Sequence, residues 1–182
     1  MSVIYFTRHG QTVWNVENKI CGATDIGLTD AGRAQARALG ERILAEGIRI
    51  DEILYSPLVR AAETAQIVAA VTGIPAFEEV RLTEQNFGRF ESTPRDGAEF
   101  AEAKKSLIYS FDGGETMLRL CHRIYDLLDD LRARDDGKIR LLVAHNGISR
   151  AVESYFRDMT NEEFAAFGMK NCDLKRYDFE DI

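Results

Sequence analysis

The sequence has little of what marks several special classes of protein. Its 182 residues include only three prolines and no tract of biased composition, so we do not expect extended disorder. No apolar run approaches the ~20 residues needed to cross a bilayer. The three cysteines, Cys21, Cys121 and Cys172, are widely separated and form none of the close pairs typical of zinc sites or disulfide frameworks. We therefore expect reduced thiols, no metal site and no cofactor.

Positive charge is scarce as well. The 23 lysines and arginines are outnumbered by 30 aspartates and glutamates, which gives a formal net charge of −7. A protein that binds nucleic acid or an anionic membrane without specificity needs a basic face, so neither is an expected partner. The chain enters Val3–Phe6 without the basic and long apolar segments of a secretory signal, so the expected location is the cytoplasm. A small basic pocket inside an acidic protein remains compatible with this charge.

Short apolar runs alternate with longer segments of helical periodicity along most of the chain. The runs predict a buried strand at 3–7 and further strands at 52–55, 76–80 and 139–144, with an edge strand at 172–179. The periodic segments predict helices at 30–46, from Ser56-Pro57 to Gly73, at 117–131 and after His145. The stretch 81–114 has no strong period and reads as a loop-rich cover with one polar helix near 98–109.

This alternation predicts an α/β fold with three layers: a mostly parallel central sheet with helices on both faces. The length of 182 residues suits one domain and is short for two, and no linker or internal repeat interrupts the pattern. We therefore expect a single domain over 1–182.

Cationic side chains follow three of the predicted strands. Arg8 and His9 come directly after the first, Arg60 lies in the first turn of the helix after the second, and His145 ends the strand at 139–144. In a parallel sheet the carboxyl ends of the strands meet at one edge, where ligands bind. Two guanidiniums and two imidazoles at that edge predict a site for a compact, doubly charged anion such as a phosphate group.

The residues around these cations resemble a known family. Arg8-His9-Gly10-Gln11-Thr12-Val13-Trp14-Asn15 is similar to the Arg-His-Gly-(Glu/Gln)-Thr-x-x-Asn signature of the histidine phosphatase superfamily, also called the phosphoglycerate mutase-like family. Further segments match in the same order along nearly the whole chain: 22–32, 55–65, 82–88, 113–116 and 143–145. The fold that this resemblance implies, a phosphoglycerate mutase-like α/β sandwich, agrees with the alternation of strands and helices.

The resemblance also implies a role for each catalytic candidate. His9 would attack phosphorus and become phosphohistidine, which requires a neutral ring with one bare nitrogen. Arg8, Arg60 and His145 would bind the phosphoryl oxygens, and Glu84 would protonate the leaving alkoxide and then activate water. Because these groups neutralise the phosphate, no metal ion would be needed. The residues implied to bind substrate are Arg8, Thr12, Asn15, Gly22, Arg60 and Asn146.

Other interpretations of single residues stay open. Thr12 and Asn15 are also common as caps of local turns, and Glu84 could lie on a solvated surface. Glu91 is a second carboxyl group in the loop-rich cover and an alternative acid. His122 falls between core positions of a helix and is given no function. Ser92 and Asn146 occupy positions where family members commonly have glycine.

Departures from the family pattern favour one activity over another. The acid segment reads Glu84-Gln85-Asn86-Phe87-Gly88, whereas phosphoglycerate mutases usually have Glu-Arg-His-Tyr-Gly there and carry a much longer insertion afterwards. A shorter cover leaves phosphohistidine open to water, so we predict a phosphomonoesterase acting on a small phosphorylated metabolite, as a monomer or homodimer. The alternatives are mutase-type phosphoryl transfer, which would make the protein an isomerase, and a non-catalytic module that binds a phosphorylated ligand.

Overall fold

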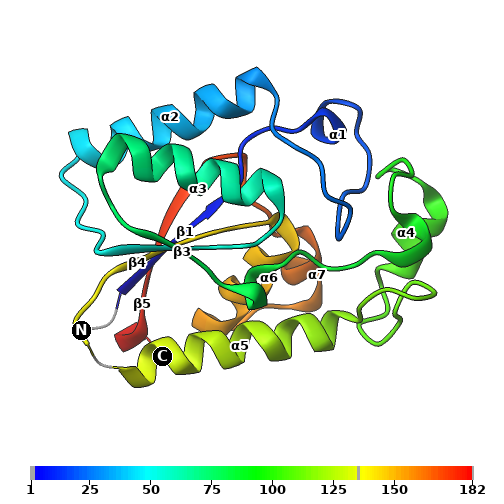
Figure 1. Ribbon diagram of the computed structural model, residues 1–182. Coiled ribbons are helices and arrows are strands. Elements are labelled where there is room, and N and C mark those ends of the chain that lie inside the picture. Colours follow the sequence, from blue (N-terminus) through cyan, green and yellow to red (C-terminus); the bar gives the residue numbers. More distant parts are fainter. Residues whose placement is uncertain (1–2, 135, 182) are drawn as a thin grey trace.

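A five-stranded sheet forms the centre of the computed structural model, which describes residues 3–134 and 136–181 (Figure 1). The strands are β1 (Val3–Arg8), β2 (Glu52–Tyr55), β3 (Ala76–Glu78), β4 (Arg140–Ala144) and β5 (Leu174–Asp178). Their spatial order is β3-β2-β4-β1-β5, and every pair is parallel except β1 with the edge strand β5. The predicted mostly parallel sheet and its edge strand are confirmed.

Helices cover both faces of this sheet, as predicted. Figure 1 shows α2 (Asp30–Ala45) and α3 (Val59–Thr72) on one face, with α5 (Met117–Arg134) and α6 (Asn146–Phe156) on the other. The shorter elements are α1 (Val13–Val16), η1 (Val80–Leu82), η2 (Gly88–Phe90), α4 (Ala98–Ala103), α7 (Asn161–Ala166) and η3 (Phe179–Asp181).

Burial explains why the long helices form where they do. Every residue of β4 is buried, and α5 packs against the sheet through a stripe of apolar side chains that includes Leu120, Ile124 and Leu131. Burying one such side chain contributes roughly 1.5–3 kcal/mol, so this stripe holds α5 in place despite its charged outer face. A separate cluster around Leu39 and Val68 packs α2 and α3 on the opposite face.

The start of α3 differs from the prediction. The helix begins at Val59, and Ser56 does not cap it, because Leu58 is extended (φ −63°, ψ 131°). The cap comes from a distant part of the chain: Asp25 Oδ1 accepts a hydrogen bond of 2.7 Å from the Val59 N–H. The Ser56 hydroxyl is directed instead to His145. Because the capping residue lies 34 positions away in the sequence, the residues next to the helix start cannot predict where the helix begins.

The loop-rich cover is also more ordered than its sequence suggests. It contains η1, η2 and α4, and α4 ends at Ala103 rather than near 109. A small cluster of aromatic side chains, separate from the two main cores, holds it together: Phe87, Phe90, Phe100 and Phe111, with Ile20. The cover is therefore packed onto the loop after α1.

Candidate active site

The predicted cations meet at the carboxyl ends of β1 and β4, which lie side by side in the middle of the sheet. The register pairs Arg8 with Ala144, so that His9 and His145 follow at the same level. The backbone N–H of His9 donates to the backbone carbonyl of Ala144 at 2.9 Å. The centroids of the two imidazole rings lie 5.2 Å apart. The two strands therefore place one imidazole beside the other.

The His9 ring is held in the form that a nucleophile requires. Its Nδ1 lies 2.7 Å from the carbonyl oxygen of Gly10, which can only accept, so Nδ1 carries the proton and Nε2 is bare. Burial, together with the charges of Arg60 and Arg8, holds the pKa of His9 well below its usual 6.5. His9 is therefore neutral at neutral pH, as the resemblance required.

His145 is completely buried behind His9. Its Nε2 lies 2.7 Å from Ser56 Oγ, and its Nδ1 has no hydrogen-bond partner among the described residues. Burial is the main cause of a pKa well below 6.5, and Arg60 is the next. With the Ser56 hydroxyl as donor, the neutral ring carries its proton on Nδ1 and can offer it to an anion.

Arg60 is also completely buried, and it is held by backbone rather than by a carboxylate. Its Nη1 and Nη2 donate to the carbonyls of Thr24 (2.9 Å) and Gly22 (2.7 Å). Thr64 connects this helix with the His9 loop, because its Oγ1 donates to the Arg60 carbonyl at 2.7 Å and accepts from the Gly10 N–H at 3.0 Å.

Arg8 completes the cationic group. Its Nη1 donates to the Met169 carbonyl at 2.9 Å, and Asn146 Oδ1 accepts from the Met169 N–H at 2.9 Å. Burial lowers the pKa of Arg8 to about 10. Three of the four buried side-chain polar atoms without a partner in the described residues belong to this group: Arg8 Nε, Arg60 Nε and His145 Nδ1. Unpaired buried donors are costly, and a tetrahedral oxyanion would pair with them.

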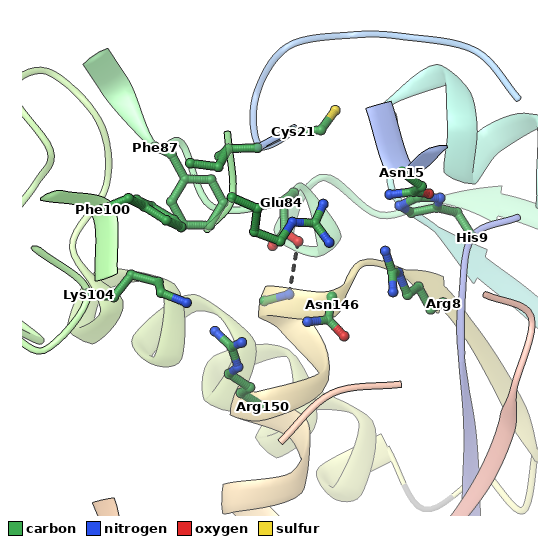
Figure 2. Close-up of a pocket in the computed structure, with 13 residues that line it drawn as sticks. Arg8, His9, Asn15, Cys21, Glu84, Phe87, Phe100, Lys104, Asn146 and Arg150 are labelled. Atoms are coloured by element: carbon green, nitrogen blue, oxygen red, sulfur yellow. Dashed lines mark hydrogen bonds between the residues drawn. The ribbon is translucent and has the colours of Figure 1, made fainter. Parts of the chain in front are cut away.

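Glu84 stands over the same pocket, at the start of α6. Its Oε2 accepts from the Gly147 N–H at 2.9 Å, drawn as a dashed line in Figure 2, and its Oε1 accepts from the Gln85 N–H at 2.9 Å. A Cβ at residue 147 would lie 2.4 Å from Glu84 Oε1, so glycine is what permits this close approach. The helix start therefore fixes the position of the carboxyl group.

Glu91, the alternative acid, lies elsewhere. It does not line the pocket, and its oxygens accept from the backbone N–H groups of Gly22, Ala23 and Thr24 at 3.1–3.3 Å. They also accept from the Thr24 hydroxyl at 2.7 Å. A carboxylate engaged in this way organises a loop, so the geometry favours Glu84 over Glu91 as the acid.

The predicted binding residues divide into two groups. Arg8, His9, Asn15, Glu84 and Asn146 line the pocket, and Figure 2 shows them around its inner part. Arg60, His145, Gly22 and Thr12 are all buried and do not themselves line it, although the His145 ring lies beside that of His9, which does. The Thr12 hydroxyl accepts from the Asn15 N–H at 3.3 Å and caps α1, which is the local role that the sequence left open.

Sequence reasoning missed three further cations in the pocket lining: Arg95, Lys104 and Arg150. Arg150 follows Asn146 by four residues, so both lie on one face of α6, and that spacing could have revealed it. Arg95 and Lys104 come from the cover, where no periodicity predicts which way a side chain faces. Across residues 3–134 and 136–181, no three His, Cys, Asp or Glu side chains are grouped to hold a metal ion. In the same part of the chain no helix is long and apolar enough to span a bilayer.

Comparisons with known proteins agree with this geometry. The sequence pattern of the histidine phosphatase superfamily (branch 1) matches residues 4–181. A relative from Yersinia pestis named "probable phosphoglycerate mutase GpmB" is 30% identical over 100% of this chain and 86% of its own length. A mycobacterial glucosyl-3-phosphoglycerate phosphatase, solved with VO3, has a TM-score of 0.83 at 26% identity, covering 96% of this chain and 90% of that one. A phosphoserine phosphatase from Entamoeba histolytica, solved with 3-phosphoglyceric acid, has a TM-score of 0.85 at 26% identity, covering 99% and 92%.

Proposed function

The chain belongs to the histidine phosphatase superfamily, and from that premise we propose that it hydrolyses a small phosphomonoester through a phosphohistidine, without a metal ion. One observation carries the proposal. His9 has its Nδ1 proton held by the Gly10 carbonyl, and its bare Nε2 belongs to a ring kept neutral beside Arg8 and Arg60. This is the arrangement that a nitrogen nucleophile needs next to an anionic substrate.

In the first step, His9 Nε2 attacks phosphorus and the bond from phosphorus to the ester oxygen breaks. Glu84, in its protonated form, gives its proton to the departing alkoxide. Arg8, Arg60 and the His145 Nδ1–H stabilise the charge on the three remaining oxygens. Because phosphoryl transfer has a loose transition state, catalysis here consists mainly of positioning and electrostatic stabilisation.

In the second step the same carboxyl group acts as a base. Glu84, now ionised, takes a proton from a water molecule whose oxygen attacks the phosphorus of phosphohistidine. The phosphorus–nitrogen bond breaks, inorganic phosphate leaves, and His9 regains its neutral form. Glu84 ends protonated, ready for another cycle.

The acceptor in the second step distinguishes two candidate activities. The short cover between Gly88 and Gly113 favours water as the acceptor, and so do the two solved relatives, both of which are named phosphatases. The relative named as a probable phosphoglycerate mutase favours the second candidate, in which the phosphoryl group returns to an organic acceptor. The third alternative, a non-catalytic module, is disfavoured because both the nucleophile and the acid are retained.

One experiment tests the proposal. The protein is mixed briefly with ³²P-labelled phosphomonoesters (sugar phosphates, phosphoserine, nucleotides and phosphoglycerates) and quenched in base. We expect a base-stable, acid-labile phosphoprotein and release of inorganic phosphate. The label should be absent in His9→Ala and present in His122→Ala, since His122 lies on an exposed part of α5. Label retained by His9→Ala would overturn the proposed nucleophile, and isomerised product formed only with a bisphosphate primer would show a mutase.

A further inference from the structure

A second and larger cavity adjoins the catalytic pocket. The catalytic pocket encloses about 70 Å³, whereas its neighbour encloses about 450 Å³. Lys104 and Arg150 line both, so they stand at the junction. Small-molecule sites typically measure about 300–1,000 Å³, so the catalytic pocket alone is too small for much beyond the phosphoryl group. The neighbouring cavity falls within that range.

The junction is strongly cationic although the chain is acidic overall. In the described part of the chain, neither Lys104 nor Arg150 takes part in an ion pair, whereas Lys105 next to them pairs with Glu102 at 2.5 Å. Figure 2 shows the charged ends of Lys104 and Arg150 directed toward each other, on the opposite side of Asn146 from Arg8. Burial is the main cause of a lowered pKa in both residues: Arg150 and Arg95 lower that of Lys104 further, whereas for Arg150 the Glu84 carboxylate opposes the shift and Arg95 adds to it. An anionic group would relieve that repulsion.

The larger cavity has a wide apolar surface, and exposed polar side chains, among them Lys105, Asn161 and Glu162, also line it. Its apolar lining residues come from the end of the cover, from α5 and from α7: Leu107, Phe111, Met117, Phe164 and Ala165. Gln85 also lines it and is 1% exposed. Its Nε2 donates to the Glu115 carbonyl at 2.9 Å, while its Oε1 has no partner among the described residues. The cavity therefore offers an apolar surface, one buried hydrogen-bond acceptor and several exposed polar groups.

We propose that this cavity binds the leaving group of the substrate, which carries a second anionic group between Lys104 and Arg150 and a bulky apolar body beyond it. The proposal rests on the proposed function, since it assumes that the phosphoryl group is bound at His9. It adds a substrate class: a phosphomonoester with a carboxylate or second phosphate near the ester, and an apolar part that fills the cavity.

Four matched probes separate these features: N-acetyl- and N-(2-naphthoyl)-O-phosphoserine, each as the free acid and as the carboxamide. We expect the naphthoyl acid to have the highest kcat/KM. Replacing naphthoyl by acetyl should lower kcat/KM by about tenfold or more, because a large apolar area is no longer buried. Replacing the carboxylate by carboxamide should lower it by about three- to fivefold, as is typical of a partly solvated charge pair.

Two pairs of variants assign these effects to the cavity. Ala165→Trp adds bulk at a position of α7 that lines the cavity, whereas Ala166→Trp adds the same bulk at the next position, which does not line it; both positions are exposed. Lys104→Gln removes a charge at the junction, whereas Arg119→Gln removes one from an exposed position of α5. We expect Ala165→Trp to abolish the preference for naphthoyl over acetyl, and Lys104→Gln to abolish the preference for acid over carboxamide. Neither control should change these ratios.

Calorimetric binding of the naphthoyl acid to the His9→Ala variant gives a readout that does not depend on turnover. Binding that Ala165→Trp weakens by about tenfold, and Ala166→Trp does not, supports the cavity even if turnover is absent. Equal kcat/KM for naphthoyl and acetyl probes, or binding indifferent to Ala165→Trp, would overturn the leaving-group site. Failure of the proposed function would appear differently, as no phosphoenzyme and no hydrolysis of any phosphomonoester, including p-nitrophenyl phosphate.

Discussion

Glu91 and Arg60 hold opposite sides of one loop, residues 22–24, without touching each other. Glu91 accepts the N–H groups of Gly22, Ala23 and Thr24, while Arg60 donates to the carbonyls of Gly22 and Thr24. The carboxylate thus fixes the loop whose carbonyls fix the guanidinium. Gly22 is required for this packing, since a Cβ there would lie 2.1 Å from the Gln85 carbonyl oxygen.

A first prediction follows for Glu91→Gln. The amide keeps only one acceptor oxygen and turns an NH₂ group toward backbone N–H donors, so the loop and Arg60 should shift. We expect a stability loss of about 1–3 kcal/mol, which is typical of leaving buried donors unpaired. Single-turnover phosphorylation should fall by about tenfold for alkyl phosphates and p-nitrophenyl phosphate alike. Glu102→Gln, on the exposed side of α4, is the control. A loss confined to alkyl phosphates would instead make Glu91 the acid.

Glu84→Gln should behave in the opposite way, because an acid matters in proportion to how much the leaving group needs a proton. A sugar or serine alkoxide leaves poorly at neutral pH, whereas p-nitrophenolate leaves without help. We expect single-turnover bursts on alkyl phosphates to fall by about 10²–10⁴-fold, with a much smaller loss on p-nitrophenyl phosphate. Steady-state rates should fall for both, since the same carboxylate activates water. Equal burst losses would mean that Glu84 only positions the substrate.

The comparison of Glu84 and Glu91 shows where sequence reasoning succeeds and fails. The ends of β1 and β4 could be predicted, because buried apolar runs indicate parallel strands and Arg8, His9 and His145 follow them directly. The sequence could not show which of Glu84 and Glu91 is the acid. The role of Glu91 depends on its hydrogen bonds to a loop that lies 67–69 residues earlier in the chain.

Local sequence patterns also fail to predict three other features of the structure: the start of α3, the position of Lys104 and the conformation of Ser92. Asp25 caps α3 from a distance of 34 residues, so the local Ser56-Pro57 pattern placed the helix start too early. Lys104 lies in a segment without periodicity, so nothing in the sequence indicates that it faces a pocket. Ser92 adopts φ 67°, which explains why glycine is common there, but the sequence alone shows only the departure.

The buried histidines predict a pH dependence of stability. The pKa values of His9 and His145 are held well below 6.5 in the folded protein, while in the unfolded chain each returns to about 6.5. The unfolded state therefore binds more protons as the pH falls below about 6.5. Each histidine should then cost on the order of 1 kcal/mol of stability per pH unit, down to its folded-state pKa, and nothing above about pH 7.5.

Urea unfolding from about pH 8 to pH 5 measures this contribution. His9→Asn removes one such group, so the decrease in stability toward acid should be shallower than in the native chain by on the order of 1 kcal/mol per pH unit. His122→Asn, at an exposed position, serves as the matched control. Parallel stability curves for the native chain and His9→Asn would mean that folding leaves the pKa of His9 unchanged, contrary to a ring kept neutral by burial and by Arg8 and Arg60.

The last prediction concerns metal ions. A phosphate dianion must be neutralised for a nucleophile to approach it, and many phosphoryl-transfer enzymes use Mg²⁺ for this purpose. Here Arg8 and Arg60 supply fixed positive charge at the His9 ring, and the His145 Nδ1 and both Arg Nε atoms are buried donors without a partner in the described residues. We therefore expect hydrolysis to persist in excess EDTA and not to increase with added Mg²⁺ or Zn²⁺.

Arg60→Lys keeps one charge but loses the planar fork that spans two carbonyls, so its activity should fall by at least about tenfold and should not be restored by metal. Activity that EDTA abolishes and Mg²⁺ restores in the native chain would show that these cations do not suffice.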